Sequence, residues 1–276
     1  MTSVIFLILK ANSKQMEFKD IFTSPKPIIA CIHLMPLPGA PLYQGDMDGI
    51  FETALQEVEI FKRNNVDGLI VENFRDMPFY PDKLPPETIA AMTAVIQEIR
   101  NAFSGPIGVN ALRNDAQSAM AIAVATQTQF IRVNIHTGSA VTDQGLIHGK
   151  AYETLRLRAN LKSDVLIFAD VDVKHASPLG NRGIEAETRD LSDRGLADAI
   201  IVSGEGTGRL TNSSDIEKVR KNTNLPILLG SGVLPENINN FSEIADGFIV
   251  GSYFKKDGKA MNTVDEVRVK GFMGKL

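Results

Sequence analysis

The stretch Ile227-Leu228-Leu229-Gly230-Ser231-Gly232-Val233 is followed further along the chain by Phe248-Ile249-Val250-Gly251-Ser252. Each is an apolar run that ends in glycine and serine. Glycines let backbone amides approach an anion, serine hydroxyls add donors, and a following helix N-terminus would add partial positive charge. Glycines also turn tight corners, but this signature on two consecutive strands is typical of strands 7 and 8 of a phosphate-binding barrel. We therefore predict phosphate contacts at Gly230, Ser231, Gly232, Gly251 and Ser252.

Six further apolar runs precede these two, at residues 28–32, 68–71, 107–109, 130–133, 165–168 and 199–202. The eight starts advance by about 31 residues, the length of one βα unit, and near-continuous apolar runs are typical of parallel strands covered on both faces. Helical spacing lies between them, as at Leu55, Val58 and Phe61. The sequence predicts an α/β protein, a (β/α)8 TIM barrel of the phosphate-binding (ribulose-phosphate-binding) type, with an open doubly wound sheet as the alternative.

The chain is expected to divide into an N-terminal extension, residues 1–25, and a single barrel domain, residues 26–276. Val4–Leu9 is its most apolar run. It is too short for a membrane span, no Lys or Arg precedes it, and no small-residue cleavage site follows it. It fits a barrel-plugging strand, a dimer contact or an upstream start artefact equally well.

Composition narrows the class of protein. The chain has 276 residues, of which 43% are hydrophobic and 22% charged, as expected for a globular protein with one large core. Its net charge of −4 argues against nucleic acid or anionic lipid as partner. Cys31 is the single cysteine, which excludes an intramolecular disulfide and a zinc site with two or four thiolates and favours a reducing, cytoplasmic location. We expect a phosphorylated small-molecule ligand, and homo-oligomerisation stays open.

Polar residues follow the predicted strands at the edge where barrels build their active sites. Phe168, Asp170 and Asp172 share one face at period two, so an inward Phe168 brings both carboxylates into the barrel mouth. The candidate catalytic residues are His33, Glu72, Arg132, Asp170, Asp172 and Lys174, and the other pocket residues are Asn110, Asn134 and His175. The alternative for Arg132 is a buried ion-pair network with Asp170 or Glu72 that holds the barrel top together.

Lys174 also fits a Schiff-base aldolase. Imine chemistry needs a lowered lysine pKa, however, and the neighbouring carboxylates act in the opposite direction. Glu72, Asp170, Asp172 and His175 offer hard donors without zinc-specific spacing, so we expect Mg²⁺ or no metal. The run 203–208 fails the dinucleotide fingerprint and is predicted to form a substrate-covering loop, with Gly204 among the phosphate contacts.

Six separated motifs together resemble the BtpA family over roughly residues 26 to 274: residues 27–39, 67–73, 132–134, 172–175, 230–233 and 246–252. The family is named for photosystem I biogenesis and looks related to phosphate-binding barrels of the tryptophan-synthase-α and ribulose-phosphate type. Some relatives are associated with sugar-phosphate uptake and metabolism. The resemblance implies a barrel and a phosphate pocket more securely than a role in photosynthesis.

Two classes of function follow. The first is an enzyme acting on a phosphorylated sugar, nucleoside or similar metabolite, with Glu72 or Asp170 as general acid/base and Lys174 or Arg132 stabilising negative charge. The second is a ligand-binding or assembly factor without turnover. Acidic, basic and imidazole groups around a phosphate site favour the enzyme.

Overall fold

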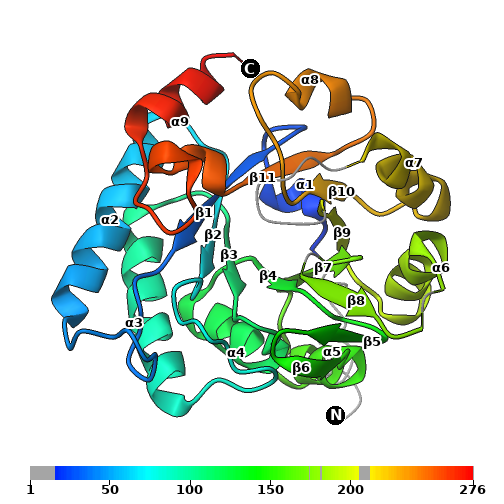
Figure 1. Cartoon of the computed structure of the whole chain (residues 1–276), viewed down its shortest axis with the longest axis horizontal. Coiled ribbons are helices and arrows are strands. Elements are labelled where there is room, and N and C mark those ends of the chain that lie inside the picture. Colours follow the sequence, from blue (N-terminus) through cyan, green and yellow to red (C-terminus); the bar gives the residue numbers. More distant parts are fainter. Residues whose placement is uncertain (1–15, 174, 181, 205–211, 276) are drawn as a thin grey trace, which may run out of the picture.

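Eight parallel strands close into a barrel in the computed structural model, which describes residues 16–173, 175–180, 182–204 and 212–275. The barrel strands are β1 (Ile28–His33), β2 (Gly68–Glu72), β3 (Ile107–Asn110), β4 (Phe130–Val133), β7 (Leu166–Val171), β9 (Ala199–Val202), β10 (Ile227–Leu229) and β11 (Gly247–Val250). Their order is β1-β11-β10-β9-β7-β4-β3-β2, and the sheet closes on itself (Figure 1). The (β/α)8 prediction is confirmed, and the open sheet is excluded.

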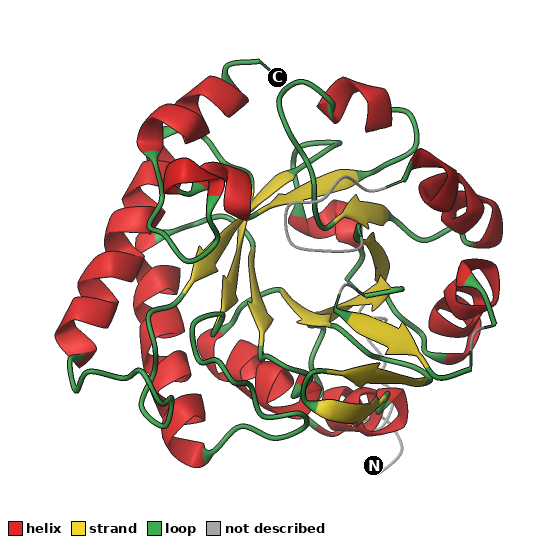
Figure 2. Cartoon of the chain, in the orientation of Figure 1, coloured by secondary structure: helices red, strands yellow, loops and turns green. Residues whose placement is uncertain are grey.

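Helices surround the barrel (Figure 2). Those between barrel strands are α2 (Met47–Arg63), α3 (Pro86–Ala102), α4 (Ala116–Thr126), α5 (Ala151–Asn160), α6 (Ile184–Arg189), α7 (Ser213–Asn222) and α8 (Ile238–Phe241), with α9 (Glu266–Met273) after the last strand. Aspartates begin several of them: the Asp46, Asp115 and Asp265 carboxylates accept from amides of the first turn of α2, α4 and α9. No helix among the described residues is long and apolar enough to cross a membrane.

The core has two layers. The larger cluster lies between strands and helices, and a second cluster fills the barrel interior. Phe130 and Phe168 stack inside the barrel with ring centroids 4.4 Å apart. Gly108 makes room for them, because a Cβ there would lie 2.0 Å from the Phe130 ring.

The short helix α1 (Phe18–Ile21) closes one end of the barrel. Phe18 lies 5.8 Å from Phe168 and Phe22 lies 6.2 Å from Phe130, measured between ring centroids. Residues 16–22, assigned from the sequence to an extension, therefore pack against the barrel interior. The apolar run Val4–Leu9 lies outside the described residues.

Side-chain clamps fasten alternate strand pairs at this same N-terminal end. Asp67, Asp198 and Asp246 each directly precede a strand and accept from an amide at the start of the neighbouring strand, those of Ile28, Ile167 and Ile227, at 2.7, 2.7 and 2.8 Å. Gln129 does the same with the Ile107 amide at 2.9 Å. The clamped pairs are β1/β2, β3/β4, β7/β9 and β10/β11.

A small antiparallel sheet was not predicted. It consists of β5 (Ser139–Thr142), β6 (Gly145–His148) and β8 (Ala176–Pro178), in the order β6-β5-β8. It is built from the segments that follow β4 and β7, and therefore stands beside the barrel mouth (Figure 1).

Candidate active site

A cavity of about 720 Å³ opens at the C-terminal ends of the barrel strands. It is lined by most of the residues selected from the sequence: His33, Glu72, Asn110, Arg132, Asn134, His175, Gly230, Ser231, Gly232, Gly251 and Ser252. These residues come from seven strands and the loops that follow them. The C-terminal mouth is thus the place where the selected polar groups meet, as expected for this fold.

Arg132 is the centre of a buried ion-pair network. Its Nε and Nη2 donate to the two Asp170 oxygens at 2.8 Å each, and its Nη1 donates to Glu72 Oε1 at 3.3 Å. Burial by itself lowers the pKa of Arg132, but Asp170 and Glu72 outweigh it, and the pKa lies above its ordinary value. Arg132 is therefore a permanent cation at the cavity wall.

The Asp170 carboxylate accepts four hydrogen bonds. Besides the two bonds from Arg132, it accepts from Asn134 Nδ2 at 3.3 Å and from Ser203 Oγ at 3.2 Å, and its side chain is 0% exposed. These contacts match the alternative stated from the sequence, a buried ion-pair network of Arg132 with Asp170 or Glu72. A carboxylate held in this way orients Arg132 and has little freedom to exchange protons with a ligand.

Glu72 and His33 form a pair that faces the cavity. His33 Nδ1 lies 2.9 Å from the Ala260 carbonyl oxygen, which only accepts, so Nδ1 carries a proton. His33 Nε2 then points toward Glu72 Oε2 at 3.7 Å, while Glu72 Oε1 accepts from Asn110 at 3.0 Å. Phe74 stacks on the imidazole with ring centroids 4.3 Å apart. The pair can hold one proton between an imidazole nitrogen and a carboxylate oxygen.

The glycine loops lie directly beside these charged groups. A methyl group added at Gly230 would lie 3.5 Å from Arg132 Nη2, and one added at Gly251 would lie 3.6 Å from His33 Cε1. The amides of Gly232 and Val233 donate to no other described residue. Gly204 does not line the cavity, but its amide donates to Ser231 Oγ at 2.6 Å and so fixes the loop after β10.

The helices after β10 and β11 are too short to add the partial positive charge expected from the sequence. The α8 helix has four residues, and β11 is followed by the 3₁₀ turn Ser252–Phe254. Positive charge comes from elsewhere in the chain. Arg113, after β3, and Arg268, on α9, both line the cavity, and Asp143 does so from the β5–β6 turn.

Arg113 and Arg268 were missed in the sequence because neither follows a strand within a recognisable motif. Arg268 is held by its Nε bond to the Tyr253 carbonyl at 2.6 Å, and its guanidinium lies 4.4 Å from the Tyr253 ring centroid. Arg113 is only 6% exposed, and burial lowers its pKa. Only the closed barrel brings these residues to the same cavity as Arg132.

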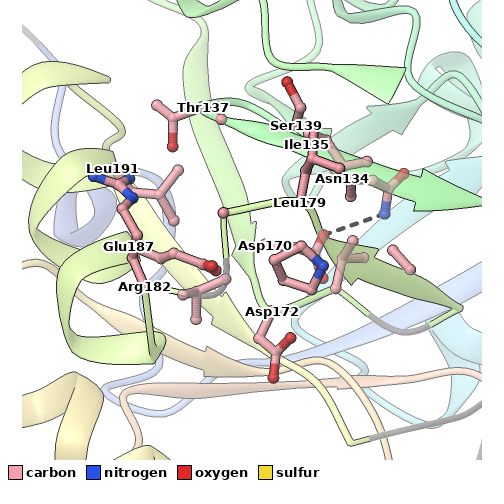
Figure 3. Close-up of a pocket in the computed structure, with 17 residues that line it drawn as sticks. Asn134, Ile135, Thr137, Ser139, Asp170, Asp172, Leu179, Arg182, Glu187 and Leu191 are labelled. Atoms are coloured by element: carbon pink, nitrogen blue, oxygen red, sulfur yellow. Dashed lines mark hydrogen bonds between the residues drawn. The ribbon is translucent and has the colours of Figure 1, made fainter. Parts of the chain in front are cut away.

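Asp172 does not join this cluster. Its φ of +48° ends the alternation of β7, and its side chain is exposed in a separate side pocket of about 480 Å³. In Figure 3 it extends away from the hydrogen-bonded pair Asn134 and Asp170, and Glu187 and Arg182 also line this pocket. Period two does not carry Asp172 into the central cavity, because β7 ends at Val171; Asp172 shares the side pocket with Asp170 and Asn134.

The expected Mg²⁺ ligands are not gathered into one donor set. Glu72 and Asp170 bond to Arg132, Asp172 lines the side pocket, and His175 lines the central cavity. The described residues contain no group of three or more His, Cys, Asp or Glu suited to a metal. We therefore derive no step through a metal. Lys174 and most of the loop 203–208, with the Schiff-base and substrate-cover hypotheses attached to them, lie outside the described residues.

The segment 252–265, here called the strap, connects β11 to α9 and borders the cavity. It supplies Ser252 and Gly258 to the lining and the Ala260 carbonyl to His33. A fully buried lysine anchors it: Lys255 Nζ donates to Glu57 Oε2 on α2 at 2.9 Å, and Glu57 Oε1 accepts from the Val264 amide at 3.0 Å. Burial lowers the pKa of Lys255 despite Glu57. Glu57, which lies on α2 outside the cavity, thus holds the strap in place.

The fold and the site together define a TIM barrel with glycine loops and a charged cluster at its mouth. The chain belongs to the BtpA family, whose model matches residues 24–276. It is 42% identical over 94% of its length to the photosystem I biogenesis protein BtpA of Synechocystis sp., covering 90% of that protein. An uncharacterized protein of Pyrococcus furiosus is 44% identical over 91% of this chain and 95% of its own. An uncharacterized protein of Caenorhabditis elegans, described as mitochondrial, is 33% identical over 94% of this chain and 96% of its own.

Solved structures share the barrel at low sequence identity. Phosphoribosyl anthranilate isomerase of Thermus thermophilus matches with a TM-score of 0.55 and 10% identity over 90% of this chain and 97% of its own. Thiamine phosphate pyrophosphorylase of Pyrococcus furiosus matches with a TM-score of 0.56 and 9% identity over 91% of this chain and 95% of its own. At these identities the likeness shows the fold alone.

Proposed function

We propose that this BtpA-family barrel is an enzyme that binds a phosphorylated small metabolite in the central cavity and transfers protons at its C-terminal rim. One observation carries the proposal: within a single cavity, glycine loops after β10 and β11 lie beside the Arg132, Glu72 and His33 cluster. Barrels with a phosphate-binding edge place the reacting part of the substrate over the centre of the mouth.

The charge balance of the cavity supports an anionic ligand. Among the described lining residues, three guanidinium groups (Arg113, Arg132 and Arg268) face two carboxylates (Glu72 and Asp143). The chain as a whole carries a net charge of −4, so three guanidinium groups at one cavity are a local concentration of cationic donors, although Asp170 is bound to Arg132 from outside the lining. Backbone amides at Gly232 and Val233 add donors without a side-chain entropy cost.

His33 and Glu72 are the proposed proton-transfer pair. The Ala260 carbonyl fixes the His33 tautomer, and Asn110 and Arg132 hold Glu72 Oε1, which leaves Oε2 directed at His33 Nε2. A substrate hydroxyl or C–H brought within hydrogen-bond distance of either group from the cavity would exchange a proton with it. Arg132 would stabilise negative charge that develops beside it, with Asp170 as its positioning residue.

A binding screen tests the proposal. Thermal shift with inorganic phosphate and a panel of phosphorylated metabolites should find ligands that raise the melting temperature, because ligand bound only to the folded state adds stability. Arg268→Met keeps the packing on Tyr253 but removes the charge, and it should weaken the best ligand about tenfold or more. Arg63→Met, on the exposed face of α2, is the control and should leave affinity unchanged. Failure of every phosphorylated compound to bind would refute the proposal.

A non-catalytic ligand-binding or assembly factor is the second candidate. It is favoured by the name of the 42% identical relative, a photosystem I biogenesis protein. The two candidates differ in turnover: a ligand that binds tightly and is recovered chemically unchanged after long incubation with the protein supports the assembly factor, whereas conversion supports the enzyme.

A further inference from the structure

The wall of the central cavity across from the glycine loop after β10 is apolar, and no function has been assigned to it. It is formed by the loops after β2 and β3, which contribute Phe74, Met77, Phe79 and Leu112 to the lining. In the closed strand order, β2 and β3 lie three to four strands away from β10 and two to three strands away from β11. The cavity therefore has a polar anion-binding side and an apolar side across the mouth.

This apolar wall exposes surface that a small sugar phosphate would leave in water. Met77 is 40% exposed, and Phe74 and Phe79 are partly exposed, although all three line a cavity. Burying apolar surface stabilises a complex by about 25 cal/mol per Å², and a thioether beside aromatic rings adapts to flat ligands. A cavity of about 720 Å³ lies within the range that holds drug-sized molecules of several rings.

Arg113 adds a polar contact on the same wall. It directly follows Leu112, it is 6% exposed, and it lies in the electrostatic field of Asp143, Asp170 and Arg132. A guanidinium can lie flat on an aromatic ring and can donate to ring carbonyl oxygens or nitrogens. The wall thus combines apolar faces with a directed donor, the combination that recognises a planar heterocycle.

We infer that the ligand of this site is a phosphorylated compound with a planar heterocyclic ring, of the nucleoside 5′-monophosphate class. The phosphate lies at the loops after β10 and β11, and the ring packs on Met77 and Phe79 beside Arg113. This places the linking sugar over His33 and Glu72, where the proposed proton transfer occurs. The inference rests on the proposed function and specifies its substrate class.

The test compares three probes by calorimetry: inorganic phosphate, ribose 5-phosphate and a set of purine and pyrimidine nucleoside 5′-monophosphates. At least one nucleotide should bind ten times more tightly than ribose 5-phosphate. Phe79→Ala should remove most of that difference while leaving ribose 5-phosphate binding within about twofold. Tyr80→Ala is the matched control, since Tyr80 is the next residue, is 51% exposed and does not line this cavity.

The outcomes separate the two proposals. If ribose 5-phosphate binds as tightly as every nucleotide, or if Phe79→Ala weakens both equally, the ring site is refuted and the phosphate site stands. If no probe binds, the proposed function fails and the ring site fails with it. If Tyr80→Ala removes the preference as fully as Phe79→Ala, the ring does not lie on the wall assigned to it.

Discussion

Carboxylate side chains bind different partners at the two ends of the barrel. At the N-terminal end, Asp67, Asp198 and Asp246 direct their oxygens at backbone amides of the adjacent strand, and α1 closes the barrel with aromatic rings. At the C-terminal end, Glu72 and Asp170 direct theirs at a guanidinium beside an open cavity. A carboxylate just before a strand accepts from a backbone amide and stabilises the sheet. A carboxylate at the end of a strand pairs with Arg132 and contributes to the candidate site.

Removing Asp170 should have the largest effect on stability. Asp170→Ala leaves Arg132 buried without its main counter-ion, a change that costs about 3–5 kcal/mol in comparable sites. Urea unfolding measures the loss. Asp172→Asn, two residues further along, is the control, because asparagine also tolerates the left-handed backbone at this position, and it should change the free energy of unfolding by less than about 0.5 kcal/mol. A loss at Asp170 below about 1 kcal/mol would show that Arg132 does not depend on this carboxylate.

Removing an N-terminal clamp should cost less and should spare the ligand site. Asp198→Ala deprives both the Ile167 amide and Arg158 Nη1 of a partly buried acceptor, which costs about 1–3 kcal/mol. The same change at the more exposed Asp246 should cost less than at Asp198. Ligand affinity, measured by calorimetry, should be unchanged in both variants. Weakened binding in either would contradict the division between the two ends.

Glu72→Gln should alter chemistry more than stability. The amide oxygen can still accept from Asn110 and Arg132, so the stability loss should stay below about 1 kcal/mol. The variant has no carboxylate to exchange a proton with His33, and turnover of an identified substrate should fall by about 10²-fold or more. Steady-state kinetics and urea unfolding measure the two effects. Full turnover would remove Glu72 from the proton-transfer pair.

The smallest expected effect concerns His136, which is buried beside the barrel mouth and contacts the Gly195 carbonyl but lines neither pocket. Burial lowers its pKa below the ordinary 6.5. Below pH 6.5 the unfolded chain therefore binds a proton that the folded chain does not, so His136 makes stability decline as the pH falls. His136→Gln should flatten the stability–pH curve on this acid side, which urea unfolding at a series of pH values measures. Parallel curves for His136→Gln and the unmodified chain would contradict this assignment.

The fold was predictable because the barrel strands are buried on both faces and therefore appear as uninterrupted apolar runs. Much of the polar lining of the mouth was predictable for a related reason: Glu72, Asn110 and Arg132 occupy the final residues of such runs or lie next to them. The failures have local causes. Asp172 adopts a left-handed backbone that no apolar pattern reveals, and β5, β6 and β8 are short and half-exposed, so their alternation is weak. Arg113 and Arg268 reach the cavity through tertiary packing alone.

The alternating clamps divide the barrel into four strand pairs, each tied internally by a side chain that precedes its second strand. Between pairs, the described residues join the sheet by backbone bonds without such a clamp. A chain cut in the exposed turn Asp143–Gln144, between β4 and β7, separates no clamped partners, so the two fragments should reassemble when mixed. A cut before Gln129 would instead divide the β3/β4 pair. The clamps thus indicate where the chain can be cut without separating clamped strands. Each clamped pair of strands, a quarter of the barrel, is the unit that we expect to be exchangeable with the same unit of a relative.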